Sequence, residues 1–218
     1  LLVYIPANYS PLYQYHLCIA SDGRDYFQLG GIARLADQLI DDYDIEQTIF
    51  VGVPYRDVKD RARKYTPTGD LFEKYMRFLA HELVPYLDAE FSTNQLASSR
   101  VLMGDSKAGT AALMGVIQYP NIFGKAILHS PYVDEHVLEK MEGVTHGDSI
   151  FLYHVIGLKE DQVTTMDKQI KDFLTPNRAL HDIIMLKNIP NFYEEFDGNH
   201  SWTYWKPDLN RALIKIFG

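Results

Sequence analysis

Short apolar segments alternate with longer amphipathic segments along this chain. The apolar runs predict buried strands at residues 1–5, 15–20, 48–53, 101–103, 126–129, 150–156 and 192–196. Apolar residues at helical spacing predict helices at residues 26–43, 71–87, 110–119 and 209–217, and Thr175-Pro176 is a good start for another. Strands that alternate with helices of this length indicate an α/β fold with a mostly parallel sheet, flanked by helices.

No linker, repeat or low-complexity stretch interrupts this alternation, so residues 1–218 are expected to form a single domain. The polar, basic segment at 55–69 is expected to be a loop. In open parallel sheets, functional sites gather at the carboxyl ends of the strands. The residues that directly follow each predicted strand are therefore the ones to search for chemistry.

A serine follows the strand at 101–103. The sequence Gly104-Asp105-Ser106-Lys107-Ala108-Gly109 joins this strand to the next helix. This is the arrangement of the nucleophile elbow, G-x-S-x-G, whose tight turn needs small residues two positions before and after the nucleophile. Ala108 stands where the second Gly is usual. Ser106 is therefore the candidate nucleophile, and the alternative is an ordinary helix N-cap.

Partners for Ser106 follow two later strands. A serine hydroxyl needs a base to take its proton, and the chain order that accompanies this elbow is Ser, then Asp or Glu, then His. Glu160 and Asp161 follow the strand at 150–156, and either could be the acid. His200 follows the last strand and is the candidate base.

Other reactive side chains fit a site less well. His129 and His154 lie within predicted strands and are expected to be packed. The histidines form no H-E-x-x-H motif or Cys/His cluster, so no metal site and no cofactor are expected. Cys18, the single cysteine, lies in an apolar strand, where a thiol is inert.

Ester cleavage also needs an oxyanion hole and a pocket. The backbone N–H of Lys107 is one candidate donor, and that of Arg24, in the turn at 21–24, is the other; an ordinary Asp-Gly turn would look the same. Trp202 is a candidate to bind an apolar or aromatic acyl group, although core packing explains it equally well. Arg61 is a candidate to bind an anionic group, although a solvated loop is the favoured interpretation of segment 56–64.

Composition limits the partners. The net charge of −8 argues against a nucleic-acid partner, because phosphate binding needs a basic face. No apolar run reaches the length of a membrane span, and no signal peptide is visible. A lone cysteine fits a reducing compartment, so a cytoplasmic location is expected, although the chain opens on Leu1 without an initiator Met. The oligomeric state is left open.

Several motifs together resemble the putative esterase family of α/β-hydrolases, which includes esterase D, feruloyl esterase and enterochelin esterase types. They are Val3-Tyr4-Ile5-Pro6, the helix from Phe78 to Tyr86, Tyr119-Pro120-Asn121-Ile122-Phe123-Gly124, Asn177-Arg178-Ala179-Leu180, and Gly198-Asn199-His200-Ser201-Trp202-Thr203-Tyr204-Trp205. The resemblance implies the α/β-hydrolase fold and a metal-free Ser–acid–His serine esterase. The family's acid usually stands three positions after the glycine that ends its strand; counted from Gly157, that residue is Glu160. Ala108 and the charged Lys107 depart from the family pattern and bear on substrate preference.

The expected function is hydrolysis of a small-molecule carboxylic ester through an acyl-enzyme. Acyl transfer with the same residues is the alternative enzyme activity, in which an alcohol replaces water. The alternative of another class is a catalytically silent binding domain, against which the intact Ser106 and His200 count.

Overall fold

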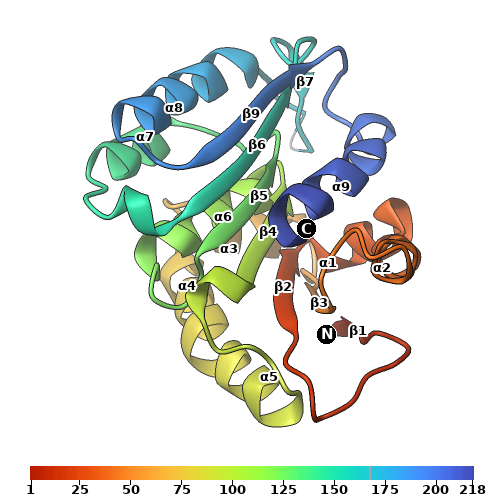
Figure 1. Cartoon of the computed structure of the whole chain (residues 1–218). Coiled ribbons are helices and arrows are strands. Elements are labelled where there is room, and N and C mark those ends of the chain that lie inside the picture. Colours follow the sequence, from red (N-terminus) through yellow and green to blue (C-terminus); the bar gives the residue numbers. More distant parts are fainter. Residues whose placement is uncertain (167) are drawn as a thin grey trace.

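Seven strands form the central sheet, in the order β1-β3-β2-β4-β5-β6-β9 (Figure 1). The structure is a computed structural model that describes residues 1–166 and 168–218. The strands are β1 (Leu2–Tyr4), β2 (His16–Ser21), β3 (Thr48–Val53), β4 (Arg100–Asp105), β5 (Lys125–His129), β6 (Phe151–Gly157) and β9 (Asn191–Phe196). β1 pairs antiparallel with β3, and the other neighbouring strands run parallel. The predicted mostly parallel sheet is confirmed, and each predicted strand is present with its ends within two residues of the predicted ones.

Helices cover both faces of this sheet (Figure 1). They are α1 (Gly23–Asp25), α2 (Ile32–Asp41), α3 (Val58–Tyr65), α4 (Phe72–Phe78), α5 (Val84–Glu90), α6 (Lys107–Gln118), α7 (Glu135–Glu142), α8 (Leu174–Leu186) and α9 (Trp202–Phe217). Two segments are π-helical. Tyr26–Gly30 lies between α1 and α2, and Leu79–Leu83 lies between α4 and α5. Short 3₁₀ turns lie at Ala97–Ser99 and Gly147–Ser149.

Alternation along the strands divides the core into two layers. In β2, Leu17 and Ile19 belong to a cluster shared with α4, α6 and α8, whereas Cys18 and Ala20 belong to a cluster shared with α2 and α9. Successive side chains of a strand point to opposite faces, so a strand buried on both faces must be apolar throughout. This explains why the central strands have continuous hydrophobic sequences.

Some predicted elements were wrong in detail. The helix predicted at 26–43 is interrupted at Gly31, whose φ of 69° lies in the left-handed region and starts α2 afresh. The segment at 55–69 was expected to be a loop, yet it contains α3. The Asp57 side chain accepts a hydrogen bond from the Asp60 backbone N–H and caps this helix, a signal that the high density of charges concealed.

The sequence did not predict α7 or a short hairpin, and it predicted the last helix to be shorter than it is. The elements missed are α7 and a hairpin of β7 (Val163–Thr164) and β8 (Ile170–Lys171). The last helix begins at Trp202 rather than near residue 209, and Pro207 stands within it. Proline is disfavoured in a helix interior, which made the earlier turn look like a loop.

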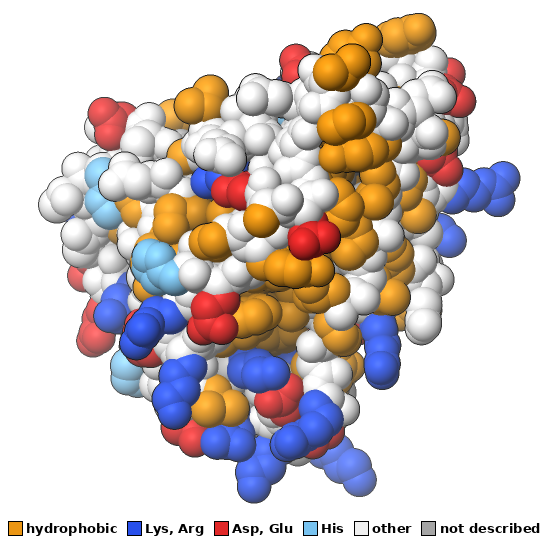
Figure 2. Space-filling model, turned by 90° about the horizontal axis from the view of Figure 1, so that it is seen from below, with side chains coloured by type: hydrophobic (Ala, Val, Ile, Leu, Met, Phe, Trp, Pro, Cys, Tyr) orange, Lys and Arg blue, Asp and Glu red, His pale blue; other side chains and the backbone are white. Residues whose placement is uncertain are grey.

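Charged side chains are unevenly spread over the surface. Figure 2 shows a face on which Lys and Arg gather along the lower part, while hydrophobic side chains form a band across the middle. Within the described residues, no helix combines the length and the apolar character needed to cross a bilayer.

Candidate active site

Ser106 stands between β4 and α6 in an unusual backbone conformation. Its φ is 52° and its ψ is −125°, a combination that L-residues rarely adopt and that costs about 1–3 kcal/mol. Hydrogen bonds hold the turn on both sides: the Ser106 N–H donates to the His129 carbonyl at 2.9 Å, and the Ser106 carbonyl accepts from the Tyr132 N–H at 3.0 Å. The backbone around Ser106 therefore has the strand–turn–helix geometry of a nucleophile elbow.

Small residues make this turn possible. A Cβ atom on Gly104 would overlap the backbone carbonyl of Ala108, so Gly104 has no room for a side chain. Ala108 is fully buried and packs in the core cluster with α6. The methyl group of Ala108, where glycine is usual, is thus accommodated within the core.

Glu160 and His200 are joined by a hydrogen bond. The Glu160 Oε2 atom lies 2.6 Å from His200 Nδ1. The Glu160 side chain is completely buried, and that of His200 is 14% exposed. Asp161, the other candidate acid, is exposed to solvent. Of the two adjacent carboxylates, Glu160 is therefore the one brought to His200.

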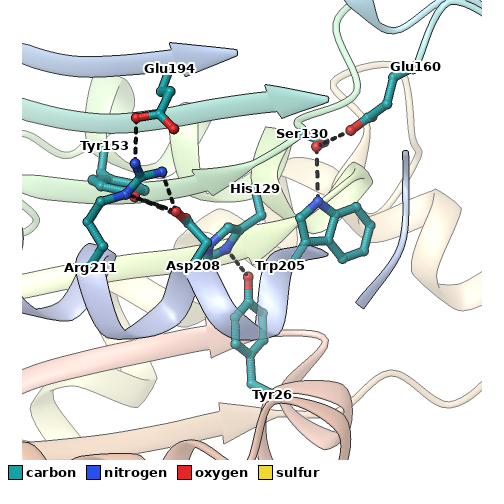
Figure 3. A network of polar contacts seen from close by, with 9 residues as sticks. All are labelled: Tyr26, His129, Ser130, Tyr153, Glu160, Glu194, Trp205, Asp208 and Arg211. Carbon is teal, nitrogen blue, oxygen red and sulfur yellow. Dashed lines mark hydrogen bonds and ion pairs between the residues drawn. The ribbon is translucent and has the colours of Figure 1, made fainter. Parts of the chain in front are cut away.

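The other oxygen of Glu160 is also occupied. Oε1 accepts hydrogen bonds from the Gly157 N–H at 2.9 Å and from the Ser130 hydroxyl at 2.7 Å. Ser130 in turn contacts the Trp205 indole N–H at 3.0 Å, as Figure 3 shows. A buried carboxylate costs free energy unless its oxygens are hydrogen-bonded, and these contacts meet that need.

Ser106 and His200 line the same cleft, which has a volume of about 800 Å³. The His200 ring packs against Phe173 and Trp205, with centroid distances of 4.4 and 4.8 Å. The remaining lining residues include an apolar or aromatic set and a charged set. The first is Leu29, Tyr55, Val58, Ala62, Val163, Met166 and Trp202, the second is Asp25, Lys59, Arg61, Asp105 and Lys107, and Thr164, Thr165 and Ser201 complete the lining.

Both predicted substrate-binding residues line this cleft, but they differ in how far their side chains are exposed and in what they contact. Trp202 packs edge-on against the buried Tyr26 at 4.9 Å and presents part of its surface to the cleft. Arg61 is 5% exposed, and its guanidinium binds the Asp22 carboxylate at 2.5 to 3.0 Å. Its charge is thus neutralised within the protein, contrary to the interpretation of Arg61 as part of a solvated loop.

Arg61 organises the carboxylates beside the nucleophile. Burial tends to lower the pKa of Arg61, but the Asp22 carboxylate raises it above the ordinary value, so the arginine stays charged. Burial raises the pKa of Asp105 well above its usual range, and the nearby Asp22 charge acts in the same direction. Arg61 also donates to the Asp105 backbone carbonyl at 3.4 Å, which ties it to the residue before Ser106.

The two predicted oxyanion donors lie at the starts of helices. Lys107 is the first residue of α6, directly after Ser106, and lines the cleft. Arg24 lies in α1 after Asp22, whose φ of 57° makes the sharp turn at the end of β2. The Arg24 side chain is exposed, and Asp25, the next residue, lines the cleft. The positive end of a helix dipole lies at the start of the helix, which suits anion binding.

His129 and His154 are buried within β5 and β6, as predicted. His154 bonds to Asn177 at 2.7 Å, and His129 lies between the Tyr26 hydroxyl at 3.1 Å and Asp208 at 3.2 Å. Figure 3 shows that Asp208 of α9 also contacts Tyr153 of β6 and Arg211, which lies one turn further along α9. No group of three or more His, Cys, Asp or Glu side chains among residues 1–166 and 168–218 could hold a metal ion.

The sequence did not identify three features of this site: Ser130, Asp22 and the β7–β8 hairpin. Ser130 follows β5 without any motif around it, and only the rule that sites follow strand ends could have drawn attention to it. Asp22 was read as a turn residue, although its position after β2 obeys the same rule. The β7–β8 hairpin supplies Val163 and Thr164 to the cleft, and two-residue strands leave no periodic pattern to detect.

Comparisons with known proteins show what this chain is similar to in sequence and in fold. The model of a protein family described as putative esterase matches residues 1–216. The chain is 49% identical over 216 residues to the uncharacterized protein YjcH of Bacillus subtilis (strain 168), covering 99% of this chain and 90% of that one.

Solved structures of other esterases share the fold. The enterobactin esterase of Shigella flexneri superposes with a TM-score of 0.82 at 18% identity, covering 98% of this chain and 54% of that one. This chain therefore spans about half the length of that enzyme. A ferulic acid esterase superposes with a TM-score of 0.79 at 14% identity, covering 99% of this chain and 90% of that one.

Proposed function

The chain belongs to the putative esterase family, and from this premise we propose that it is a serine esterase that hydrolyses a small-molecule carboxylic ester through an acyl-enzyme. The observation that carries the proposal is the conformation of Ser106. A strained turn at the end of a central strand, opening on a cleft that His200 also lines, is what an exposed serine nucleophile requires.

In the proposed reaction His200 acts as the base. Its Nδ1 atom is bound to Glu160, so the imidazole carries a proton there and presents Nε2 as the acceptor for the Ser106 hydroxyl proton. Glu160 orients the ring and stabilises the imidazolium that forms. The Ser106 Oγ atom attacks the ester carbonyl, and the proton on His200 passes to the leaving alcohol. Water then attacks the acyl-enzyme by the same route and releases the acid.

The tetrahedral intermediate carries a negative charge on the former carbonyl oxygen. We assign its stabilisation to the backbone N–H groups of Lys107 and Arg24. Lys107 is the first residue of α6, and Arg24 lies in the turn after β2. The positive end of the α6 dipole lies at the same point and acts in the same direction. Removing one such donor typically lowers kcat about 10²- to 10³-fold, so the geometry of both turns matters.

The cleft supports an ester with an apolar or aromatic part. Trp202, Phe173 and Met166 supply apolar surface to the cleft that His200 lines, and a volume of about 800 Å³ accepts a small molecule. The names of the structural relatives suggest two probes, enterobactin and a feruloyl ester. A cytoplasmic location remains a proposal that cell fractionation would test.

Active-site titration tests the proposal. A fluorophosphonate should label the protein once, at Ser106, and Ser106→Ala should stay folded, lose the label and lose hydrolysis of every ester that the wild-type protein cleaves. Labelling at another serine, or undiminished hydrolysis by the variant, would contradict the assignment. Products that incorporate an added acceptor alcohol in preference to water would identify acyl transfer instead.

A further inference from the structure

Ser130 occupies a fixed position at the carboxyl end of β5. The residue is completely buried, and its φ of 46° lies in the left-handed region, where a non-glycine residue is uncommon. Its N–H donates to the Val155 carbonyl of β6 at 2.8 Å. The backbone therefore sets the direction of the Ser130 side chain, which points between α9 and the loop after β6 (Figure 3).

The directions of the two Ser130 hydrogen bonds follow from the chemistry of the partners. An indole N–H can only donate, so Trp205 donates to the Ser130 oxygen at 3.0 Å. The hydroxyl hydrogen is then left for Glu160 Oε1 at 2.7 Å, since an ionised carboxylate can only accept. The result is an ordered chain of donors from the Trp205 indole through Ser130 to the carboxylate that holds His200.

Ser130 and His200 bind opposite oxygens of the same carboxylate. Oε1 accepts from Ser130 and from the Gly157 N–H, and Oε2 accepts from His200. These three contacts fix both the position and the rotation of the carboxyl plane. Without the hydroxyl, the Gly157 N–H alone would hold Oε1, and the carboxyl group could rotate about its last bond.

We infer that Ser130 is a positioning residue, whose hydroxyl sets the orientation of Glu160 and through it the orientation of His200. This inference rests on the proposed function, in which Glu160 and His200 act with Ser106. Ser130 is buried and touches no substrate, so its effect should fall on kcat and leave KM nearly unchanged.

A purely structural role would look different. Trp205 belongs to α9, and a second set of buried contacts attaches the same helix to the sheet: Asp208 accepts from the Tyr153 hydroxyl at 2.9 Å and contacts His129. If Ser130 only attached α9 to β5, removal of the Tyr153 hydroxyl should have a comparable effect. Tyr153→Phe is therefore the matched control, because it removes a hydroxyl of β6 that bonds to Asp208 of α9 and does not contact Glu160.

The experiment compares Ser130→Ala, Ser130→Gly and Tyr153→Phe with the wild-type protein. The Gly variant relieves the left-handed backbone and the Ala variant keeps it, so an effect common to both comes from the missing hydroxyl. We expect kcat to fall about ten- to a hundredfold in both, the factor for one hydrogen bond to a charged group. Tyr153→Phe should retain wild-type kcat.

NMR of ¹⁵N-histidine-labelled protein supplies a readout that does not depend on activity. The His200 Nδ1 proton, held by Glu160 at 2.6 Å, should give a downfield signal that moves upfield in both Ser130 variants and stays in place in Tyr153→Phe. An unmoved signal in the Ser130 variants, or an equal change in Tyr153→Phe, would overturn the inference. A wild-type protein without esterase activity would instead overturn the proposed function, while the signal would still test the positioning of Glu160.

Discussion

Glu160 and His200 are 40 positions apart in the sequence, and their side chains meet with 2.6 Å between Oε2 and Nδ1. They meet because β6 and β9 are hydrogen-bonded neighbours, with Gly157 paired to Phe196 at their carboxyl ends. The loop after each strand then needs only three or four residues to bring its functional side chain to the same point. Strand order, rather than sequence proximity, assembles the pair.

Neutralising each of the two adjacent carboxylates, Glu160 and Asp161, in a separate variant should distinguish their roles. Glu160→Gln replaces the acceptor of the His200 Nδ1–H by an amide, and we expect kcat to fall on the order of 10⁴-fold, the size of the effect in the serine-protease case. Asp161→Asn changes an exposed carboxylate and should alter kcat by less than about tenfold. Steady-state kinetics on a common ester would measure both, and the opposite ranking would assign the acid role to Asp161.

Gly104 should not accept a side chain. In Gly104→Ala the new methyl group would overlap the Ala108 carbonyl, and both partners belong to rigid backbone. We expect the free energy of unfolding to fall by about 1–3 kcal/mol, the usual cost of overpacking, together with a loss of fluorophosphonate labelling as the turn at Ser106 moves. Denaturant unfolding and labelling would measure the two effects.

Ala108→Gly is the matched control for this turn. It restores the more usual residue and removes only a methyl group, so labelling of Ser106 should persist. A Gly104→Ala variant with wild-type stability and labelling would show that the turn can relax more than its close contacts suggest.

The sequence predicted the sheet well because its central strands are buried on both faces. Such strands are apolar at nearly every position, as residues 49–53 of β3 show, and a short apolar run bounded by polar residues is easy to recognise. The chain order of Ser106, Glu160 and His200 was visible for a related reason. Each residue directly follows a predicted strand, and parallel strands present those ends on one edge.

The residues that the sequence did not identify depend on contacts between distant segments. Arg61 looked like one of several solvated charges, and only the fold reveals that Asp22, 39 positions away, neutralises it. Ser130 has no sequence motif, and its role depends on two partners that follow other strands. Local patterns record burial and turns, but they carry no information on which buried polar groups pair across the fold.

The ion pair of Arg61 and Asp22 should contribute strongly to stability. Both side chains are nearly inaccessible, so removal of one partner leaves an uncompensated charge in the core. We expect Arg61→Gln to lower the free energy of unfolding by about 3–5 kcal/mol, measured by denaturant unfolding. Adding Asp22→Asn to that variant should recover part of the loss, because it removes the unpaired carboxylate and asparagine tolerates the left-handed backbone at this position.

Arg63 provides the control on the same helix. It forms a similar bidentate pair with Asp70, but both side chains are substantially exposed. Arg63→Gln should change the free energy of unfolding by less than about 1 kcal/mol, as is usual for surface pairs. Equal losses in the two variants would indicate that Arg61 matters through helix formation in α3 rather than through its buried charge.

His154 is a buried neutral imidazole. Asn177 donates through its amide to the carbonyls of Pro131 and Phe173, so its side-chain oxygen is the acceptor and His154 Nε2 carries the proton. The second ring nitrogen, Nδ1, has no hydrogen-bond partner in the part of the chain that the structure describes. Burial lowers the pKa of His154 to about 4, because a second proton would place a charge in the core.

This shift makes stability depend on pH with a definite sign. Above pH 6.5 the histidine is neutral in both the folded and the unfolded chain, so it has no effect. As the pH falls from about 6.5 toward 4, His154 is protonated in the unfolded chain but stays neutral in the folded protein. The free energy of unfolding should therefore fall by about 3 kcal/mol in total. His154→Gln cannot titrate and should lose that part of the pH dependence, whereas His136→Gln, at an exposed position, should keep it. Denaturant unfolding at pH 7.5, 5.5 and 4.5 would measure all three proteins, and parallel curves for wild type and His154→Gln would contradict a neutral His154.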